Sequence, residues 1–164
     1  MGARAMRQMI EPGERAPEFT LRSLDGKDHS LGEILSRGPA LLAFFKTTCP
    51  VCQLAFPFLD RLHRKAGASV QFIAISQDSA ADTREFLAEF GLSFPALLDE
   101  DRKNYPASNA FRISHVPSMF LVEKDGAVSW ASNGFSRIEL ADLGGRLGTE
   151  TFTAADNVPE WKAG

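Results

Sequence analysis

The sequence has few cysteines and no long hydrophobic run. Only 2 of its 164 residues are cysteine. A secreted domain held together by disulfides carries many more, so that class of protein is excluded. The longest apolar run, Ala40–Phe45, is far too short to cross a bilayer, and no apolar stretch of a secretory signal stands near the N-terminus. We therefore expect a cytoplasmic protein without membrane contact, or a periplasmic one if the natural N-terminus is longer.

An excess of charge of either sign is also missing. Lys and Arg number 18 and Asp and Glu number 21, which gives a net charge of −3. The basic residues form no cluster, so nucleic acid is not expected as a partner. Hydrophobic residues (44%) and charged residues (24%) have the proportions of an ordinary globular domain. A chain of this size buries roughly 70% of its unfolded surface, so it needs no disulfide or metal ion to fold.

Patterns typical of strands and helices alternate along the chain. The apolar runs 40–45 and 70–75 are apolar on both faces, as in buried strands of a parallel sheet. The dipeptides Asp25-Gly26 and Asp125-Gly126 are hairpin signals, which add antiparallel strands at the edges. Helical patterns cover residues 50–65, 82–90, 103–111 and 137–147, and Pro57 is expected to interrupt the helix over 50–65.

These patterns predict an α/β fold with a central mixed β-sheet flanked by helices. One domain is expected over residues 13–148, with loosely ordered termini at 1–12 and 149–164. Functional groups in such folds lie beyond the carboxyl ends of the parallel strands. The segment Lys46–Cys52, which follows the first buried strand, occupies that position.

The two cysteines lie in one turn at the predicted start of a helix. Cys49 and Cys52 are spaced so that their Cα atoms lie about 5–6 Å apart, within the range of a disulfide. Pro50 suits the first helical turn, and the N–H groups there stabilise a thiolate at Cys49. Cys52 follows the apolar Val51 and is expected to be buried and to stay a thiol until it attacks. This asymmetry is what reversible dithiol–disulfide exchange requires.

Two other interpretations of the pair are weaker. The cysteines could pack without reacting, or they could supply half of a zinc site. A closed zinc site needs four ligands. The remaining candidates are His29, His63 and His115, and none stands at zinc spacing from another. Neither a metal ion nor another cofactor is expected.

Four segments carry a resemblance to a known family. They are PGERAPEFTLRSLDGKDHSL (12–31), FFKTTCPVC (44–52), AFPFLDRL (55–62) and FPALLDEDRKNYPASNAFRISHVPSMFLVEKDGAV (94–128). Together they resemble the TlpA/ResA-like thiol–disulfide oxidoreductases of the thioredoxin-like superfamily, which are related to the AhpC/TSA peroxidases. The resemblance extends over residues 13–147.

The resemblance implies a thioredoxin-like fold with an extra N-terminal β-hairpin. It implies that Cys49 is the nucleophile, that Cys52 is the resolving cysteine, and that the Val116–Pro117 peptide bond is cis. A cis proline there exposes the Val116 backbone to a substrate beside Cys49. Pro50, Val51, Val116 and Pro117 are the expected substrate-binding residues. The implied partners are a protein or small-molecule disulfide and a thiol electron donor.

The sequence departs from the family at three positions. Thr48 replaces the usual tryptophan before the motif, and Ala43 and Ala55 stand where thioredoxins and ResA-like proteins carry a buried acid. Asp60 lies about two turns beyond Cys52 and is expected to point away. We therefore expect water to take the proton of Cys52.

Two other functions stay open at this stage. A peroxiredoxin-type peroxidase needs a Pro-x-x-x-Thr/Ser-x-x-Cys loop, but Leu42 and Lys46 stand in place of its proline and hydroxyl residue. A non-enzymatic binding or copper-handling module would need a third ligand, for which His115 is the candidate. His63 is expected to be solvated, and Trp161 to pack locally. The favoured function is that of a disulfide reductase.

Overall fold

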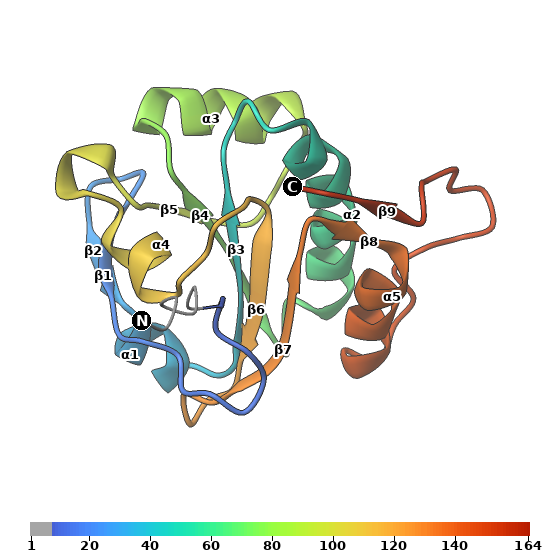
Figure 1. The fold of residues 1–164 in the computed structure, drawn as a ribbon, viewed down its shortest axis with the longest axis horizontal. Helices are drawn as coiled ribbons and strands as arrows, with labels where there is room; N and C mark the ends of the chain where they lie inside the picture. Colours follow the sequence, from blue (N-terminus) through green and yellow to red (C-terminus); the bar gives the residue numbers. More distant parts are fainter. Residues whose placement is uncertain (1–7) are drawn as a thin grey trace, which may run out of the picture.

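The computed structural model describes residues 8–164, so residues 1–7 of the predicted loose N-terminus lie outside it. A sheet of seven strands in the order β2-β1-β5-β4-β3-β6-β7 forms the centre (Figure 1). The antiparallel pairs β1–β2 and β6–β7 form its two edges, as the hairpin signals predict. The strands are β1 (Thr20–Ser23), β2 (Asp28–Ser30), β3 (Ala40–Phe45), β4 (Gln71–Ser76), β5 (Ala96–Leu98), β6 (Ser118–Val122) and β7 (Val128–Asn133).

The middle of the sheet is parallel and buried on both faces. Strand β3 pairs in parallel with β4 and antiparallel with β6. All six residues of β3 are buried. Its side chains alternate between two apolar clusters: Leu41, Ala43 and Phe45 contribute to one, and Ala40, Leu42 and Phe44 to the other. The predicted buried parallel centre and mixed sheet are confirmed.

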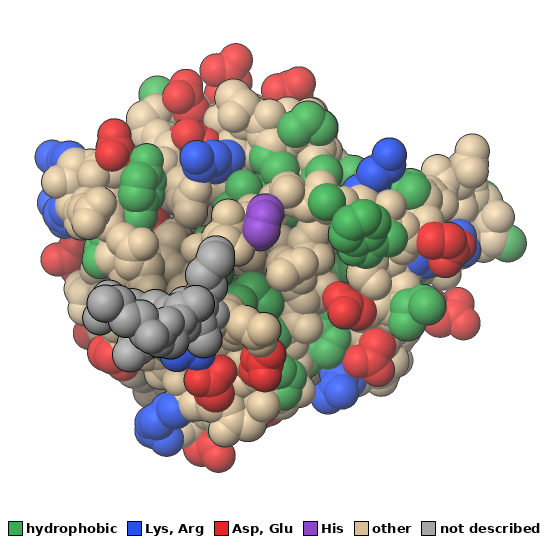
Figure 2. All heavy atoms as spheres, viewed as in Figure 1, with side chains coloured by type: hydrophobic (Ala, Val, Ile, Leu, Met, Phe, Trp, Pro, Cys, Tyr) green, Lys and Arg blue, Asp and Glu red, His purple; other side chains and the backbone are tan. Residues whose placement is uncertain are grey.

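Helices cover both faces of the sheet. The cluster around Phe45 receives side chains from α2 (Pro50–Ala66), α3 (Ala80–Glu89) and α5 (Arg137–Arg146). The cluster around Phe44 is covered by α1 (Leu31–Ser36) and α4 (Pro106–Ala110). No helix within residues 8–164 is both long enough and apolar enough to cross a membrane. Acidic and basic side chains are interspersed over the face drawn in Figure 2.

Two helix predictions differ from the structure, and one helix was not predicted. Helix α2 continues through Pro57. Because Pro57 is exposed, the backbone hydrogen bond that it cannot donate is missing only on the solvent side of the helix. The predicted helix over 103–111 is a short 3₁₀ turn, Asp101–Lys103, followed by α4. Helix α1, which has no strong sequence pattern, begins where the Ser30 side chain accepts a hydrogen bond from Glu33 N at 3.1 Å.

Residues 149–164, for which the sequence predicts loose order, make specific contacts. Thr151 is 2% exposed, and the Phe152 ring lies 4.8 Å from the Phe58 ring of α2. The segment ends as β9 (Trp161–Lys162), which pairs antiparallel with β8 (Phe135–Ser136). Figure 1 places the end of the chain close to the first turn of α2. The domain limits 13 and 148 stay predictions.

Candidate active site

The loop that follows β3 carries the cysteine pair. Strand β3 ends at Phe45, and α2 begins directly after Cys49. The Thr47 N–H donates to Asp78 Oδ2 at 2.7 Å, and the Gln53 side-chain amide donates to Thr47 O at 3.0 Å. These two hydrogen bonds connect the loop to the end of β4 and to the second turn of α2. The loop therefore has a defined path from the sheet to the helix.

Cys49 caps the N-terminus of α2. Its Sγ accepts a hydrogen bond from Cys52 N at 3.1 Å, so a helix N–H points at the sulfur. The same Sγ donates to Val116 O at 3.5 Å. Cys49 is half-buried, while its neighbours Thr48 and Pro50 are exposed. The sulfur is thus accessible and sits where N–H dipoles stabilise negative charge.

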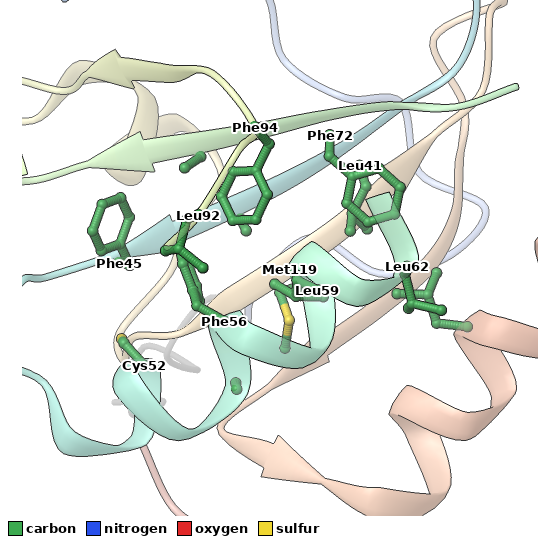
Figure 3. Packing of buried hydrophobic residues seen from close by; sticks show 14 of the residues in the cluster. Leu41, Phe45, Cys52, Phe56, Leu59, Leu62, Phe72, Leu92, Phe94 and Met119 are labelled. Carbon is green, nitrogen blue, oxygen red and sulfur yellow. The ribbon is translucent and has the colours of Figure 1, made fainter. Parts of the chain in front are cut away.

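Cys52 lies on the inner side of the same turn. Its side chain is fully buried, and Figure 3 shows it on the side of α2 that faces the sheet, in line with Phe56 and Leu59. Burial raises the pKa of the Cys52 thiol far above its usual range, and hydrogen bonding to the Cys49 sulfur raises it further. Both cysteines are free thiols. The predicted asymmetry between an accessible and a buried sulfur is present.

The Val116–Pro117 bond is cis, as the resemblance implies. It stands directly before β6, whose pairing with β3 brings it to the carboxyl end of β3 and so to Cys49. Val116 is half-buried and Pro117 is buried. Of the expected binding residues, Pro50 and Val51 lie on the first turn of α2 and Val116 and Pro117 on this loop. The fold brings both pairs of residues together beyond the carboxyl end of β3.

The acid that is missing near Cys52 is replaced neither at the two expected positions nor by Asp60. Ala43 and Ala55 are buried in the cluster that contains Cys52. Asp60 Oδ1 accepts hydrogen bonds from both the N–H and the hydroxyl of Ser93, at 2.8 Å each. Asp60 Oδ2 accepts from Arg64 at 2.7 Å. Its carboxylate is therefore fully engaged away from the cysteines, as predicted.

Sequence reasoning missed Asp78. This half-buried residue fixes the loop before Cys49, but it stands far from the CxxC motif in the sequence. A signal existed, because Asp78 follows β4 and the carboxyl ends of parallel neighbours meet at one edge. The residue could have been found by pairing the two predicted buried strands.

The histidines do not complete a metal site in the described part of the chain. Within residues 8–164, no three or more His, Cys, Asp and Glu side chains form a group that could hold a metal ion. His115 is exposed, and its Nδ1 lies 2.7 Å from the Ser114 hydroxyl. The prediction that His63 is solvated is wrong. Its ring packs 5.5 Å from Phe72 and 5.9 Å from Phe94, and its Nδ1 is buried without a hydrogen-bond partner.

Comparison with known proteins shows which family this chain resembles in sequence. Residues 12–131 match the model of the AhpC/TSA family. The thiol–disulfide oxidoreductase ResA of Geobacillus thermodenitrificans is 29% identical over 122 residues, which cover 73% of this chain and 67% of ResA. The methylamine utilization protein MauD of Methylobacillus flagellatus is 32% identical over 133 residues, which cover 78% of this chain and 60% of MauD.

Solved structures agree on the fold. The thioredoxin domain of a thiol–disulfide oxidoreductase from Bacteroides vulgatus superimposes with a TM-score of 0.73 at 18% identity, covering 84% of this chain and 97% of that one. The peroxidoxin BcpB of Mycobacterium tuberculosis superimposes with a TM-score of 0.69 at 20% identity, covering 82% and 93%. The fold is therefore thioredoxin-like, and it is shared by oxidoreductases and peroxidases. The chain is a member of the AhpC/TSA family, and thiol–disulfide oxidoreductases are among its relatives.

Proposed function

We propose that the protein is a thiol–disulfide oxidoreductase that reduces disulfides with Cys49 and Cys52. The observation that carries the proposal is the placement of the two sulfurs. Cys49 is accessible at the start of α2 and touches the Val116 carbonyl, while Cys52 is buried one turn further on. One sulfur can meet a substrate, and the other can reach only the first.

The reaction takes two displacements. The Cys49 thiolate attacks one sulfur of the substrate disulfide, forms a mixed disulfide and releases the other sulfur as a thiol after proton uptake. Cys52 then loses its proton and attacks Cys49 Sγ, which releases the second substrate thiol. The substrate gains two electrons and two protons, and the protein ends with a Cys49–Cys52 disulfide. A thiol donor restores the dithiol by the reverse exchange.

The surroundings support Cys49 as the attacking sulfur. The N–H of Cys52 points at Cys49 Sγ and stabilises negative charge on it. Burial raises the pKa of Cys52, so this thiol stays protonated and does not compete for the substrate. ResA, a relative at 29% identity, is a thiol–disulfide oxidoreductase, which agrees with this chemistry.

Three measurements made side by side test the proposal. We expect the reduced protein to reduce insulin with dithiothreitol as the thiol donor, and to show a two-electron redox transition that is lost in Cys49→Ser. We expect little consumption of hydrogen peroxide, because Lys46 stands where a peroxiredoxin has a hydroxyl residue. Fast peroxide consumption without insulin reduction would replace the proposal by the peroxidase alternative. Absence of all three activities would leave the binding-module alternative.

The direction of the reaction depends on the compartment. We propose reduction in the cytosol, where thiol donors are plentiful. The periplasm is the other possible compartment, and a structural neighbour from Mycobacterium tuberculosis is described as a secreted disulfide oxidoreductase. The reduction potential of the Cys49–Cys52 pair, measured by redox titration, distinguishes a reductase from an oxidant. A potential close to about −270 mV, as in thioredoxin, fits a reductase, whereas one near about −120 mV, as in DsbA, fits an oxidant.

A further inference from the structure

The last residues of the chain lie directly on the Val116 loop. A Cβ added to Gly164 would collide with Val116 O and would come within 2.9 Å of the Val116 carbonyl carbon. A Cβ added to Gly134 would come within 2.5 Å of Lys162 O. The same Val116 O accepts a hydrogen bond from the Cys49 thiol at 3.5 Å. Gly164 therefore lies against the Val116 carbonyl beside the reactive sulfur, and Lys162 lies against Gly134 next to it.

This segment has one firmly held part and one weakly held part. The firm part is attached to α2. Arg61 donates to both carboxylate oxygens of Asp156, at 2.6 and 3.2 Å, and to Thr151 O at 3.0 Å. The guanidinium also holds the pKa of Asp156 well below its usual range. Phe152 packs between Phe58 and Phe135. These contacts fix residues 151–156 in place.

Residues 157–164, which we call the strap, are held by fewer polar contacts, and Val158 is the strap residue that packs against the core. Arg137 N donates to Glu160 O at 2.9 Å, and the ion pair between these two residues spans 3.9 Å on the surface. The β8–β9 pairing covers two residues of each strand. The prediction that Trp161 packs locally is wrong, because its side chain is 63% exposed and adds little burial. Two-stranded pairs of this kind are marginally stable by themselves, so the strap can open while residues 151–156 stay bound.

We propose that the strap competes with an extended polypeptide for the Val116 backbone beside Cys49, and so favours small disulfides over protein disulfides. The inference rests on the proposed function and adds a substrate preference to it. A polypeptide that adds a strand along Val116 needs the space beside the Val116 carbonyl, where Gly164 lies. A small disulfide needs only the half-buried Cys49 sulfur. If the strap is open about a tenth of the time, the apparent affinity for a polypeptide falls about tenfold.

The test compares the full chain with a variant that lacks residues 157–164. Cys49 is alkylated with iodoacetamide and with a maleimide that carries a long polyethylene glycol chain. We expect the deletion to raise the rate with the bulky reagent about tenfold and the rate with iodoacetamide less than about twofold. Equal rates of bulky labelling in both proteins would overturn the inference. This readout needs no turnover, so it stands even if the proposed function fails.

Turnover gives the second measurement. The deletion should raise kcat/KM for insulin about tenfold and leave that for the small disulfide DTNB within about twofold. A fall for insulin would mean that the tail binds the substrate, which overturns the competition. Loss of both activities in the full chain as well would instead contradict the proposed function.

A point variant covers the case in which the deletion unfolds the protein, since Val158 packs against the core. Asp156→Ala removes the carboxylate that Arg61 binds and so frees the residue from which the strap starts, which should raise bulky labelling in the same direction. Asp142→Ala is the matched control, because it breaks the exposed Arg146–Asp142 ion pair in the last turns of α5, whereas the strap contacts Arg137 at the start of that helix. Bulky labelling that rises equally in both variants, or in neither, would overturn the inference.

Discussion

The Thr47 backbone N–H donates to the Asp78 carboxylate at 2.7 Å, which joins the loop before Cys49 to the end of β4. A hydrogen bond to a charged acceptor contributes about 1.5–3 kcal/mol. The bond therefore fixes the loop that determines where the Cys49 sulfur lies. Asp78 is a positioning residue in this arrangement, since it touches the loop and not the sulfur.

We expect Asp78→Ala to lower both the free energy of unfolding and the reactivity of Cys49. The loss of stability should be about 1–3 kcal/mol, because the Thr47 N–H loses its acceptor. Asp78→Asn keeps an acceptor oxygen and should recover at least half of it. Denaturant unfolding and the iodoacetamide rate measure the two effects. Full Cys49 reactivity in Asp78→Ala would show that this hydrogen bond does not position the sulfur.

The two cysteine variants should fail at different steps. Cys49→Ser is expected to abolish disulfide reduction, because the accessible nucleophile is gone. Cys52→Ser should form the mixed disulfide but not resolve it, so a covalent adduct with the substrate accumulates. Mass spectrometry under non-reducing conditions detects that adduct. If iodoacetamide labels Cys52 faster than Cys49 at neutral pH, the assignment of roles is reversed.

Resolution of the mixed disulfide should become faster as the pH rises. Burial raises the pKa of Cys52, and no carboxylate stands at Ala43 or Ala55 to take its proton. Below that raised pKa, the thiolate fraction and the resolution rate increase about tenfold per pH unit. Rapid mixing between mildly acidic and alkaline pH measures this rate. A flat profile, or a step near the pKa of a carboxylate, would show that another group accepts the proton.

The same shift makes stability depend on pH. In the unfolded chain Cys52 ionises at its ordinary pKa of about 8.5, whereas in the folded protein it stays neutral to a higher pH. Its contribution to stability is therefore complete below about pH 8.5 and decreases as the pH rises above that value. Denaturant unfolding of Cys52→Ala should lack this decrease. If the free energy of unfolding decreased equally at alkaline pH in the wild type and in Cys52→Ala, the decrease would come from other titratable groups.

Phe56→Ala should destabilise the fold more than any change on the surface. The ring is fully buried, and its centroid lies 4.7 Å from that of Phe45 and 5.8 Å from that of Phe94. Removing a phenylalanine from such a site costs about 3–5 kcal/mol. Phe56→Leu fills most of the space and should cost clearly less. Denaturant unfolding gives both values, and equal values would mean that the helix shifts to close the cavity.

Local patterns were sufficient for much of the fold and for the cysteine pair. The apolar run of β3 is buried on both faces, and the hairpin dipeptide at Asp125-Gly126 joins β6 to β7. Cys49 and Cys52 are close because one helical turn separates them, which no tertiary contact has to arrange. The cis bond at Val116 came from the family resemblance, since a proline by itself rarely indicates it.

Features that join distant parts of the chain were decided by the tertiary structure. His63 has a polar side chain on the last turns of α2, yet its ring packs against Phe72 and Phe94. Asp78 reaches Thr47 only because β3 and β4 are parallel neighbours. The strap reaches Val116 because β9 pairs with β8, which brings Gly164 to the Val116 carbonyl. Sequence spacing determines contacts within a helix or a hairpin, whereas these contacts depend on which elements the sheet order and the core packing bring together.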